Sequence, residues 1–138
     1  MNIYFSCSIT GGRQDQQVYH AIVETLLKAG HKVPTAHLSR LDVMEKEKVI
    51  FPAEVYARDV RWVQECDALV AEVSTPSHGV GYEIALALFL SKPVFCCYHH
   101  SQRVSKMILG NSSPTLTLYP YRSLDDLLPK LSEFLQFV

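Results

Sequence analysis

Short apolar runs alternate with longer segments of helical periodicity along this 138-residue chain. The apolar runs predict buried strands at residues 2–7, 31–35, 68–73, 93–98 and 115–119. Apolar residues at three- and four-residue spacing predict helices at residues 15–30, 52–66, 80–90, 103–109 and 124–137. The polar segment 36–51 is predicted as a long loop, with a helical turn near residues 43–48.

This alternation of strand and helix is typical of a parallel sheet whose crossover helices cover both faces. No internal repeat, linker or low-complexity stretch interrupts it. The pattern therefore predicts one α/β domain over residues 1–138. Its expected architecture is a five-stranded parallel sheet with helices on both faces, flavodoxin-like or Rossmann-like.

Composition excludes several classes of protein. The formal net charge of −1 provides no basic field for a nucleic acid polymer, so a phosphate group would need a local site. No apolar run approaches the roughly 20 residues that span a bilayer. The apolar start of the chain leads into Gly11-Gly12-Arg13 rather than a signal-peptide cleavage site, so a cytoplasmic or nuclear location is expected.

The cysteines and histidines do not form a recognisable framework. None of the four cysteines lies in a C-x-x-C pair, and three fall in predicted strands, which favours reduced, buried thiols. His99 and His100 are adjacent, and the other histidines lack metal-ligand spacing. We therefore expect neither a disulfide framework nor a metal site.

The first candidate for chemistry is the loop after the first predicted strand. In open α/β sheets, ligands bind beyond the carboxyl ends of the strands. There the chain places Ser8, two glycines (Gly11 and Gly12) and Arg13 just before a helix. Glycines let backbone N–H groups approach an anion, and a helix N-terminus favours negative charge. The same residues are equally consistent with a plain turn.

The loop after the third predicted strand is more informative. Ser77 could cap the following helix or donate to a phosphate, and Gly79 and Gly81 permit close backbone approach. Glu83 then lies in an otherwise apolar helix, where a carboxylate is costly unless it faces a cleft. The alternatives are a glutamate that complements the helix dipole and glycines that serve only helix–sheet packing.

Two further residues have ordinary interpretations when each is taken alone. Asp59 has Arg58 and Arg61 as neighbours, which is typical of a solvated, ion-paired surface residue. Tyr4 lies in the middle of a predicted strand, where a core aromatic is expected.

A set of short motifs, in order across residues 2–110, resembles a known family. The motifs are Tyr4-Phe5, Ser8-Ile9, Gly11-Gly12-Arg13, Asp59 with Trp62, Ala71-Glu72-Val73, Pro76-Ser77 and Gly79-Val80-Gly81-Tyr82-Glu83. They resemble the 2'-deoxynucleoside 5'-phosphate N-hydrolases of the wider nucleoside 2-deoxyribosyltransferase family. The last block is the most specific. The chain departs from the pattern at Ser6-Cys7, where vertebrate members have Cys-Gly, and at Thr10, where they have arginine.

The resemblance implies a role for each matching residue. Glu83 would be the nucleophile, Asp59 the acid/base residue that assists the leaving base, and Tyr4 the residue that orients the carboxylate. The implied substrate-binding residues are Ser8, Ile9, Gly11, Gly12, Arg13, His37, Ser77, Gly79, Gly81 and Met107. In the family's homodimer, a serine of the neighbouring subunit completes the phosphate site, and residues 103–108 nominate Ser105 for that role.

The expected reaction is cleavage of a C1'–N bond through an oxocarbenium-like sugar, with a glycosyl ester on Glu83 that water then hydrolyses. The expected substrates are 2'-deoxynucleoside 5'-monophosphates, and no cofactor is required. Three alternatives stay open at this point. They are a transferase that passes the deoxyribosyl group to a second base, a ribonucleotide hydrolase of the CMP type, and a non-catalytic nucleotide-binding module.

Overall fold

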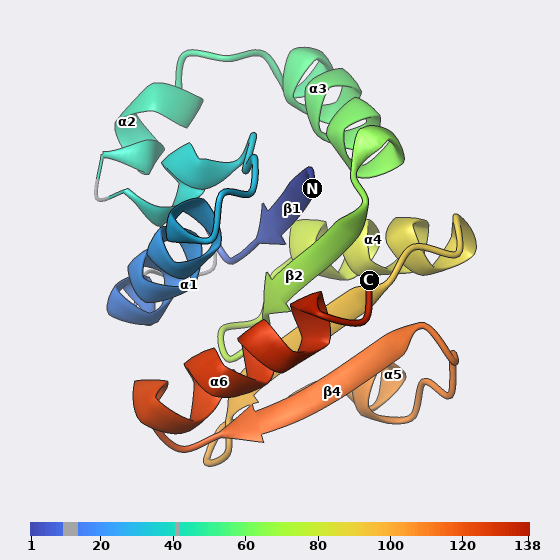
Figure 1. The fold of residues 1–138 in the computed structure, drawn as a ribbon. Helices are drawn as coiled ribbons and strands as arrows, with labels where there is room; N and C mark the ends of the chain where they lie inside the picture. Colours follow the sequence, from blue (N-terminus) through green and yellow to red (C-terminus); the bar gives the residue numbers. More distant parts are fainter. Residues whose placement is uncertain (10–13, 41) are drawn as a thin grey trace.

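The computed structural model describes residues 1–9, 14–40 and 42–138. Within these residues one parallel sheet of four strands forms in the order β1-β2-β3-β4 (Figure 1). The strands are β1 (Ile3–Ser6), β2 (Ala68–Glu72), β3 (Val94–His99) and β4 (Leu116–Tyr121). A parallel α/β domain is therefore confirmed, and its strands lie within a few residues of four of the predicted runs.

The fifth predicted strand, at residues 31–35, is wrong. Only one isolated parallel bridge, between Lys32 and Asn2, remains beside β1. Pro34 has no backbone N–H to give to a ladder. The backbone N–H of Phe5 instead donates to the side-chain hydroxyl of Thr35, at 2.8 Å. Side-chain bonding and an immediate helical turn thus replace the strand.

The helices follow the predicted periodicity closely. They are α1 (Gln16–Lys28), the 3-10 helix η1 (Ala36–Ser39), α2 (Val43–Glu47), α3 (Pro52–Glu65), α4 (His78–Phe89), α5 (Lys106–Leu109) and α6 (Leu124–Leu135). The predicted loop 36–51 therefore contains two short helices. Each described helix is too short or too polar to cross a membrane.

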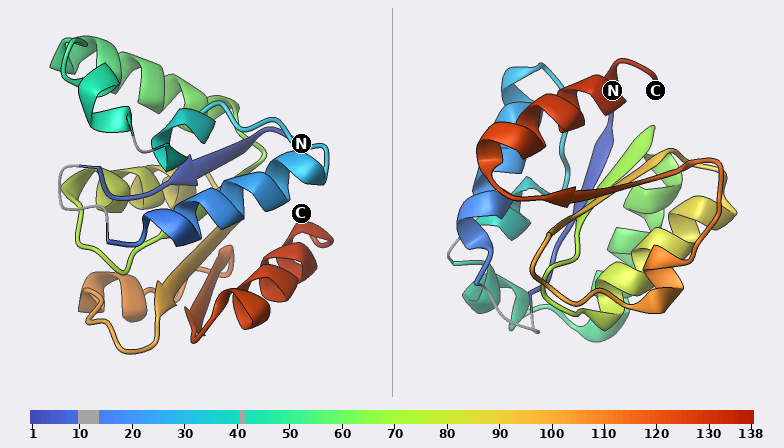
Figure 2. Two further views of the ribbon diagram at one scale, coloured as in Figure 1. Left: turned by 90° about the vertical axis from the view of Figure 1, so that its left-hand side faces the viewer. Right: turned by 90° about the horizontal axis from the view of Figure 1, so that it is seen from below.

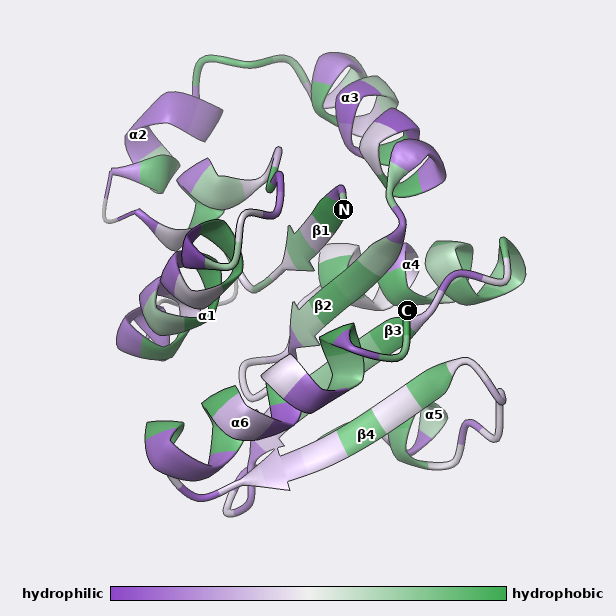
Figure 3. Cartoon of the chain, viewed as in Figure 1, coloured by the Kyte–Doolittle hydropathy of each residue, from purple (hydrophilic) through white to green (hydrophobic). Residues whose placement is uncertain are grey.

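Helices cover both faces of the sheet, as predicted (Figure 2). One apolar core lies between the sheet and α1, α6 and η1, and the other lies between the sheet and α3 and α4. Alternation along β1 divides its side chains between them. Ile3 and Phe5 enter the first core, whereas Tyr4 enters the second. The central strands are accordingly apolar along most of their length (Figure 3).

All four cysteines are buried, as predicted, and none is bridged. Burial raises the pKa of the Cys96 thiol to about 12, and the Glu72 carboxyl adds to that rise. These thiols contribute to packing rather than to nucleophilic chemistry.

Candidate active site

The Glu83 carboxylate is held by two hydroxyl groups from β1. The Tyr4 hydroxyl donates to Oε1 at 2.8 Å, and the Ser6 hydroxyl donates to Oε2. Tyr4 and Ser6 are two residues apart on a strand, so both side chains point to the face that α4 covers. Tyr4 is fully buried, as a core aromatic would be, yet its hydroxyl reaches a carboxylate.

The environment of Glu83 makes it titrate near neutral pH. Burial raises the pKa of Glu83 to about 7, although the hydrogen bonds from Ser6 and Tyr4 act to lower it. The negative charge of Asp59 adds to the rise. The pKa of Tyr4 is raised well above its ordinary value by burial and by the charges of Glu83 and Asp59, so the phenol remains a hydrogen-bond donor.

Asp59 lies on α3 and faces the same site, because its charge acts on both Tyr4 and Glu83. Its side chain is 19% exposed, and Oδ1 accepts a hydrogen bond from Nε of Arg58 at 2.8 Å. Asp59 is therefore ion-paired, as expected for a surface residue, but its side chain is not solvated as a surface residue would be. The fold thus brings together two carboxyl groups that are 24 residues apart in sequence.

His37, on η1, lies on the same side of the molecule. Its Nε2 is 3.1 Å from Oε1 of Glu47, and its ring meets Trp62 of α3 edge-on. The ring is therefore held between α2 and α3, next to the helix that carries Asp59.

Ser77 acts as the N-cap of α4, with its hydroxyl accepting from the backbone N–H of Val80 at 3.4 Å. Packing among the described residues does not require the glycines beside it. A Cβ at Gly81 would meet no described atom within 4 Å, and one at Gly79 would make only ordinary contact with Ser77. The packing interpretation of these glycines therefore loses its basis, whereas open space beside them suits a ligand.

A groove of about 760 Å³ runs between α4 and the segment that contains α5. Ser77 and Gly81 line one side, and Ser105 and Met107 of the same chain line the other. Ser105 caps α5 by accepting from the backbone N–H of Met107 at 3.2 Å. Met107 itself is 85% exposed.

The first predicted loop is only partly described. Ser8 is buried directly after β1, and Ile9 packs against the core on the α1 side. Gly11, Gly12 and Arg13 lie outside the described residues, so the phosphate-loop prediction for them stays a prediction.

The sequence pattern assigns no site role to Ser6, Arg58 or Glu47, although all three take part in this arrangement. Strand alternation could have indicated Ser6, because it shares a face with Tyr4. Nothing local could have indicated Glu47, which lies in the segment predicted as a loop.

Glu72, in the Ala-Glu-Val motif, belongs to the opposite face of the sheet. It is fully buried and accepts hydrogen bonds from the Tyr121 hydroxyl at 3.1 Å and from Ser74. Burial raises the pKa of Glu72 to about 7. The contacts of this carboxyl join the ends of strands and do not include the groups around Glu83.

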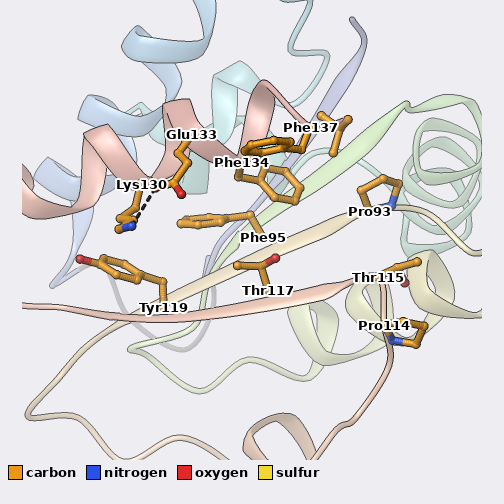
Figure 4. A pocket seen from close by; sticks show the side chains of 11 residues that line it. Pro93, Phe95, Pro114, Thr115, Thr117, Tyr119, Lys130, Glu133, Phe134 and Phe137 are labelled. Carbon is orange, nitrogen blue, oxygen red and sulfur yellow. Dashed lines mark hydrogen bonds and ion pairs between the residues drawn. The ribbon is translucent and has the colours of Figure 1, made fainter.

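A second cavity, of about 570 Å³, lies between α6 and the β3–β4 edge of the sheet (Figure 4). Aromatic side chains of Phe95, Tyr119 and Phe134 form much of its wall, and the Lys130–Glu133 ion pair lies at its rim. None of the predicted site residues lines it. Within the part of the chain that the structure describes, no group of three or more histidine, cysteine or acidic side chains could hold a metal ion.

These features define a class of protein: a small α/β fold in which α3 and α4 bring two carboxyl groups together, one of them with its pKa raised to about 7, while a separate groove runs along another side of α4. The particular family follows from comparison. Residues 3–118 match the nucleoside 2-deoxyribosyltransferase family, and the chain belongs to it.

Two relatives illustrate the similarity. A protein of Syntrophotalea carbinolica that carries the name 2'-deoxynucleoside 5'-phosphate N-hydrolase 1 is 39% identical over 137 residues, which cover 98% of this chain and 94% of the relative. The 5-hydroxymethyl-dUMP N-hydrolase of Rattus norvegicus is 42% identical over 113 residues, which cover 79% of this chain and 69% of the relative.

Among solved structures, the CMP N-glycosidase of Clostridium botulinum superposes with a TM-score of 0.72 at 18% identity, over 96% of this chain and 98% of that one. At this identity the likeness concerns the fold. It confirms the α/β layer architecture predicted from the sequence.

Proposed function

We propose that this protein hydrolyses the N-glycosidic bond of 2'-deoxynucleoside 5'-monophosphates, releasing the free base and 2-deoxyribose 5-phosphate. The observation that carries the proposal is the Glu83 carboxylate, held by Tyr4 and Ser6 and titrating near neutral pH beside Asp59. The names of the relatives support the same substrate class.

The reaction would proceed in two displacements. Glu83 attacks C1' of the sugar, the C1'–N bond breaks, and Asp59 gives a proton to the departing base. Water then attacks C1' of the glycosyl ester and releases Glu83, while Asp59 accepts the proton of the water. The hydrogen bonds from Tyr4 and Ser6 hold the carboxylate in one orientation during both steps.

The 5'-phosphate would lie near the N-terminus of α4, where Ser77 and the open space beside Gly81 meet the groove. A helix N-terminus favours an anion, and exposed glycine backbone permits close approach. His37 would then face the base, because it is packed against the helix that carries Asp59. Ser8, Ile9, Gly11, Gly12 and Arg13 remain proposed phosphate-side residues on the strength of the family resemblance.

The test is chromatographic analysis of products from each deoxynucleoside monophosphate, the matching ribonucleotides and the unphosphorylated deoxynucleosides. Glu83→Gln should reduce turnover of deoxynucleotides at least about a hundredfold, because it removes the nucleophile. Glu65→Gln, an exposed glutamate on α3, is the matched control and should retain activity. Near-wild-type turnover by Glu83→Gln would refute the mechanism. Preference for CMP, or turnover that needs an added acceptor base, would replace the proposed substrate or reaction.

We also propose that the protein works as a homodimer in which Ser105 completes the neighbouring subunit's site. Helix α4 carries large apolar side chains on its outer side as well as toward the core, and in the single chain Tyr82 and Phe89 are 52% and 85% exposed. Met107, two residues after Ser105, is also 85% exposed. A second copy would cover these side chains and remove their apolar surface from water.

Subunit mixing tests this arrangement. If Ser105 acts across the interface, a mixture of inactive Glu83→Gln and Ser105→Ala subunits regains activity, because each mixed dimer contains one complete site. A mixture that stays as inactive as its components, although light scattering shows mixed dimers, would place Ser105 in its own subunit's site. A protein that is monomeric in light scattering would refute the dimer itself.

A further inference from the structure

Arg58 joins two acidic side chains from different helices. Its Nε donates to Oδ1 of Asp59 at 2.8 Å on α3. Its two terminal nitrogens point the other way, toward the carboxylate of Glu47 on α2, at 3.2 and 3.4 Å. A guanidinium bound along two edges has little freedom to rotate, because its donors lie in one rigid plane.

The same cluster includes the groups on the proposed base side. Oε1 of Glu47 is shared by Arg58 and by Nε2 of His37, which lies 3.1 Å away. The Arg58 guanidinium also lies over the ring of Trp62, 5.0 Å from its centre. Arg58 thus joins α3 to α2, and Glu47 joins both to η1 through His37.

These contacts are partly shielded from water, which strengthens them relative to fully exposed ion pairs. The side chains of Glu47, Asp59 and Arg58 are 13%, 19% and 20% exposed. Burial disfavours the charge on Arg58, but the hydrogen bonds that it donates to Asp59 and Glu47 outweigh this effect and raise the pKa of Arg58. Arg58 is therefore a permanent cation, and its removal takes the guanidinium from Asp59 and leaves Glu47 with the contact to His37.

We propose that Arg58 is a positioning residue for Asp59, and that Glu47 anchors it in that role. Oδ1 of Asp59 accepts the hydrogen bond from Nε of Arg58, so the other carboxylate oxygen, Oδ2, would face the leaving base. Glu47 fixes the guanidinium of Arg58 and also contacts the His37 ring. The Asp59 carboxyl and the His37 ring therefore belong to one hydrogen-bonded unit. This inference rests on the proposed function, since it assigns Arg58 to the step in which Asp59 assists the leaving group.

The deciding experiment compares two substrates that differ in their need for a proton. A pyrimidine deoxynucleoside monophosphate requires assistance at the base, whereas the 4-nitrophenyl glycoside of 2-deoxyribose 5-phosphate releases a stable anion. Arg58→Gln should lower kcat on the nucleotide about 10- to 100-fold and change kcat on the nitrophenyl substrate less than about threefold. Glu47→Gln should show the same selectivity with a smaller loss.

The controls separate positioning from folding. Arg61→Gln removes an exposed arginine from the same helix and should leave both rates unchanged. Arg58→Lys keeps the charge but not the planar fork, so it should reproduce the selective loss even if Arg58→Gln does not fold. Arg58→Gln with Asp59→Asn should be no slower than Asp59→Asn alone, because both changes disable one unit.

Two results would overturn the inference. Equal losses on both substrates would mean that Arg58 acts on Glu83 or on the fold. Losses that multiply in the double variant would mean that Arg58 acts independently of Asp59. A wild-type protein that hydrolyses neither substrate would instead overturn the proposed function and the inference with it, so the two failures are distinguishable.

Discussion

At the residue scale, the proposed chemistry depends on the two hydroxyl groups that donate hydrogen bonds to the Glu83 carboxylate. Burial alone would keep Glu83 protonated, and a protonated carboxyl is a poor nucleophile. Ser6 and Tyr4 oppose burial by donating to the ionised form. The balance leaves Glu83 with a pKa of about 7, so it can ionise without leaving its apolar surroundings.

Ser6→Ala removes one of these donors. The ionised form of Glu83 is the reactive one, so kcat/KM of the wild type should rise with pH through about 7. Losing a hydrogen bond that lowers the pKa moves this rise to higher pH. We expect kcat/KM at pH 6 to fall about tenfold, with a smaller loss at pH 9. Ser132→Ala, on the exposed face of α6, is the control, and a profile of unchanged shape would contradict the role of Ser6.

At the scale of elements, the first turn of α4 serves two purposes. It must be capped, and Ser77 provides an acceptor for the backbone N–H of Val80. In the proposed function it must also receive a phosphate. The two demands can be separated because aspartate caps a helix as well as serine does but repels an anion.

Ser77→Asp should therefore retain the melting temperature of the wild type and raise KM for deoxynucleotides more than about tenfold, because it adds a negative charge at the proposed phosphate position. Ser77→Ala should lose about 1 kcal/mol of stability through the missing cap. Thermal unfolding and steady-state kinetics of both variants give the answer. An unchanged KM for Ser77→Asp would place the phosphate elsewhere.

At the scale of the whole molecule, a second buried carboxyl connects strands on the other face of the sheet. Glu72 at the end of β2 receives the hydroxyl of Tyr121 at the end of β4, and Ser74 in turn accepts the backbone N–H of His99 on β3. This network ties the carboxyl ends of three strands together.

The burial of Glu72 makes stability depend on pH, because burial raises its pKa although the hydrogen bonds from Ser74 and Tyr121 act to lower it. The pKa of Glu72 is about 7 in the folded protein and 4.5 as its ordinary value, so between these values the folded state binds more protons than the unfolded state. The free energy of unfolding should thus fall as pH rises from about 5 to 7, by up to about 3 kcal/mol, and then level off. Glu83 contributes with the same sign.

Glu72→Gln should weaken this dependence, since an amide does not titrate. Urea unfolding at pH 5 and pH 8 measures it, and the wild type should lose more stability between the two than the variant. Equal losses in the two proteins would show that Glu72 is ionised throughout or makes no contribution.

Periodicity alone determined most of the fold. Apolar spacing reflects which side chains leave water, and that information is local, so the strands β1 to β4 and the long helices appear close to their predicted bounds. The prediction at residues 31–35 was wrong for a reason that local pattern does not contain. Val33 is buried and strand-like, but Pro34 and the Thr35 side chain satisfy the neighbouring backbone in another way.

The features of the site also divide into those that the local sequence determined and those that the fold decided. The sequence by itself determined that Glu83 lies in an apolar helix and that glycines precede it, because those facts depend on adjacent residues. Only the tertiary structure decided that Tyr4 and Ser6 hold this carboxylate, and that Arg58 binds Asp59 and Glu47 together. Such contacts join residues up to 79 positions apart, and chain folding alone sets which of them meet.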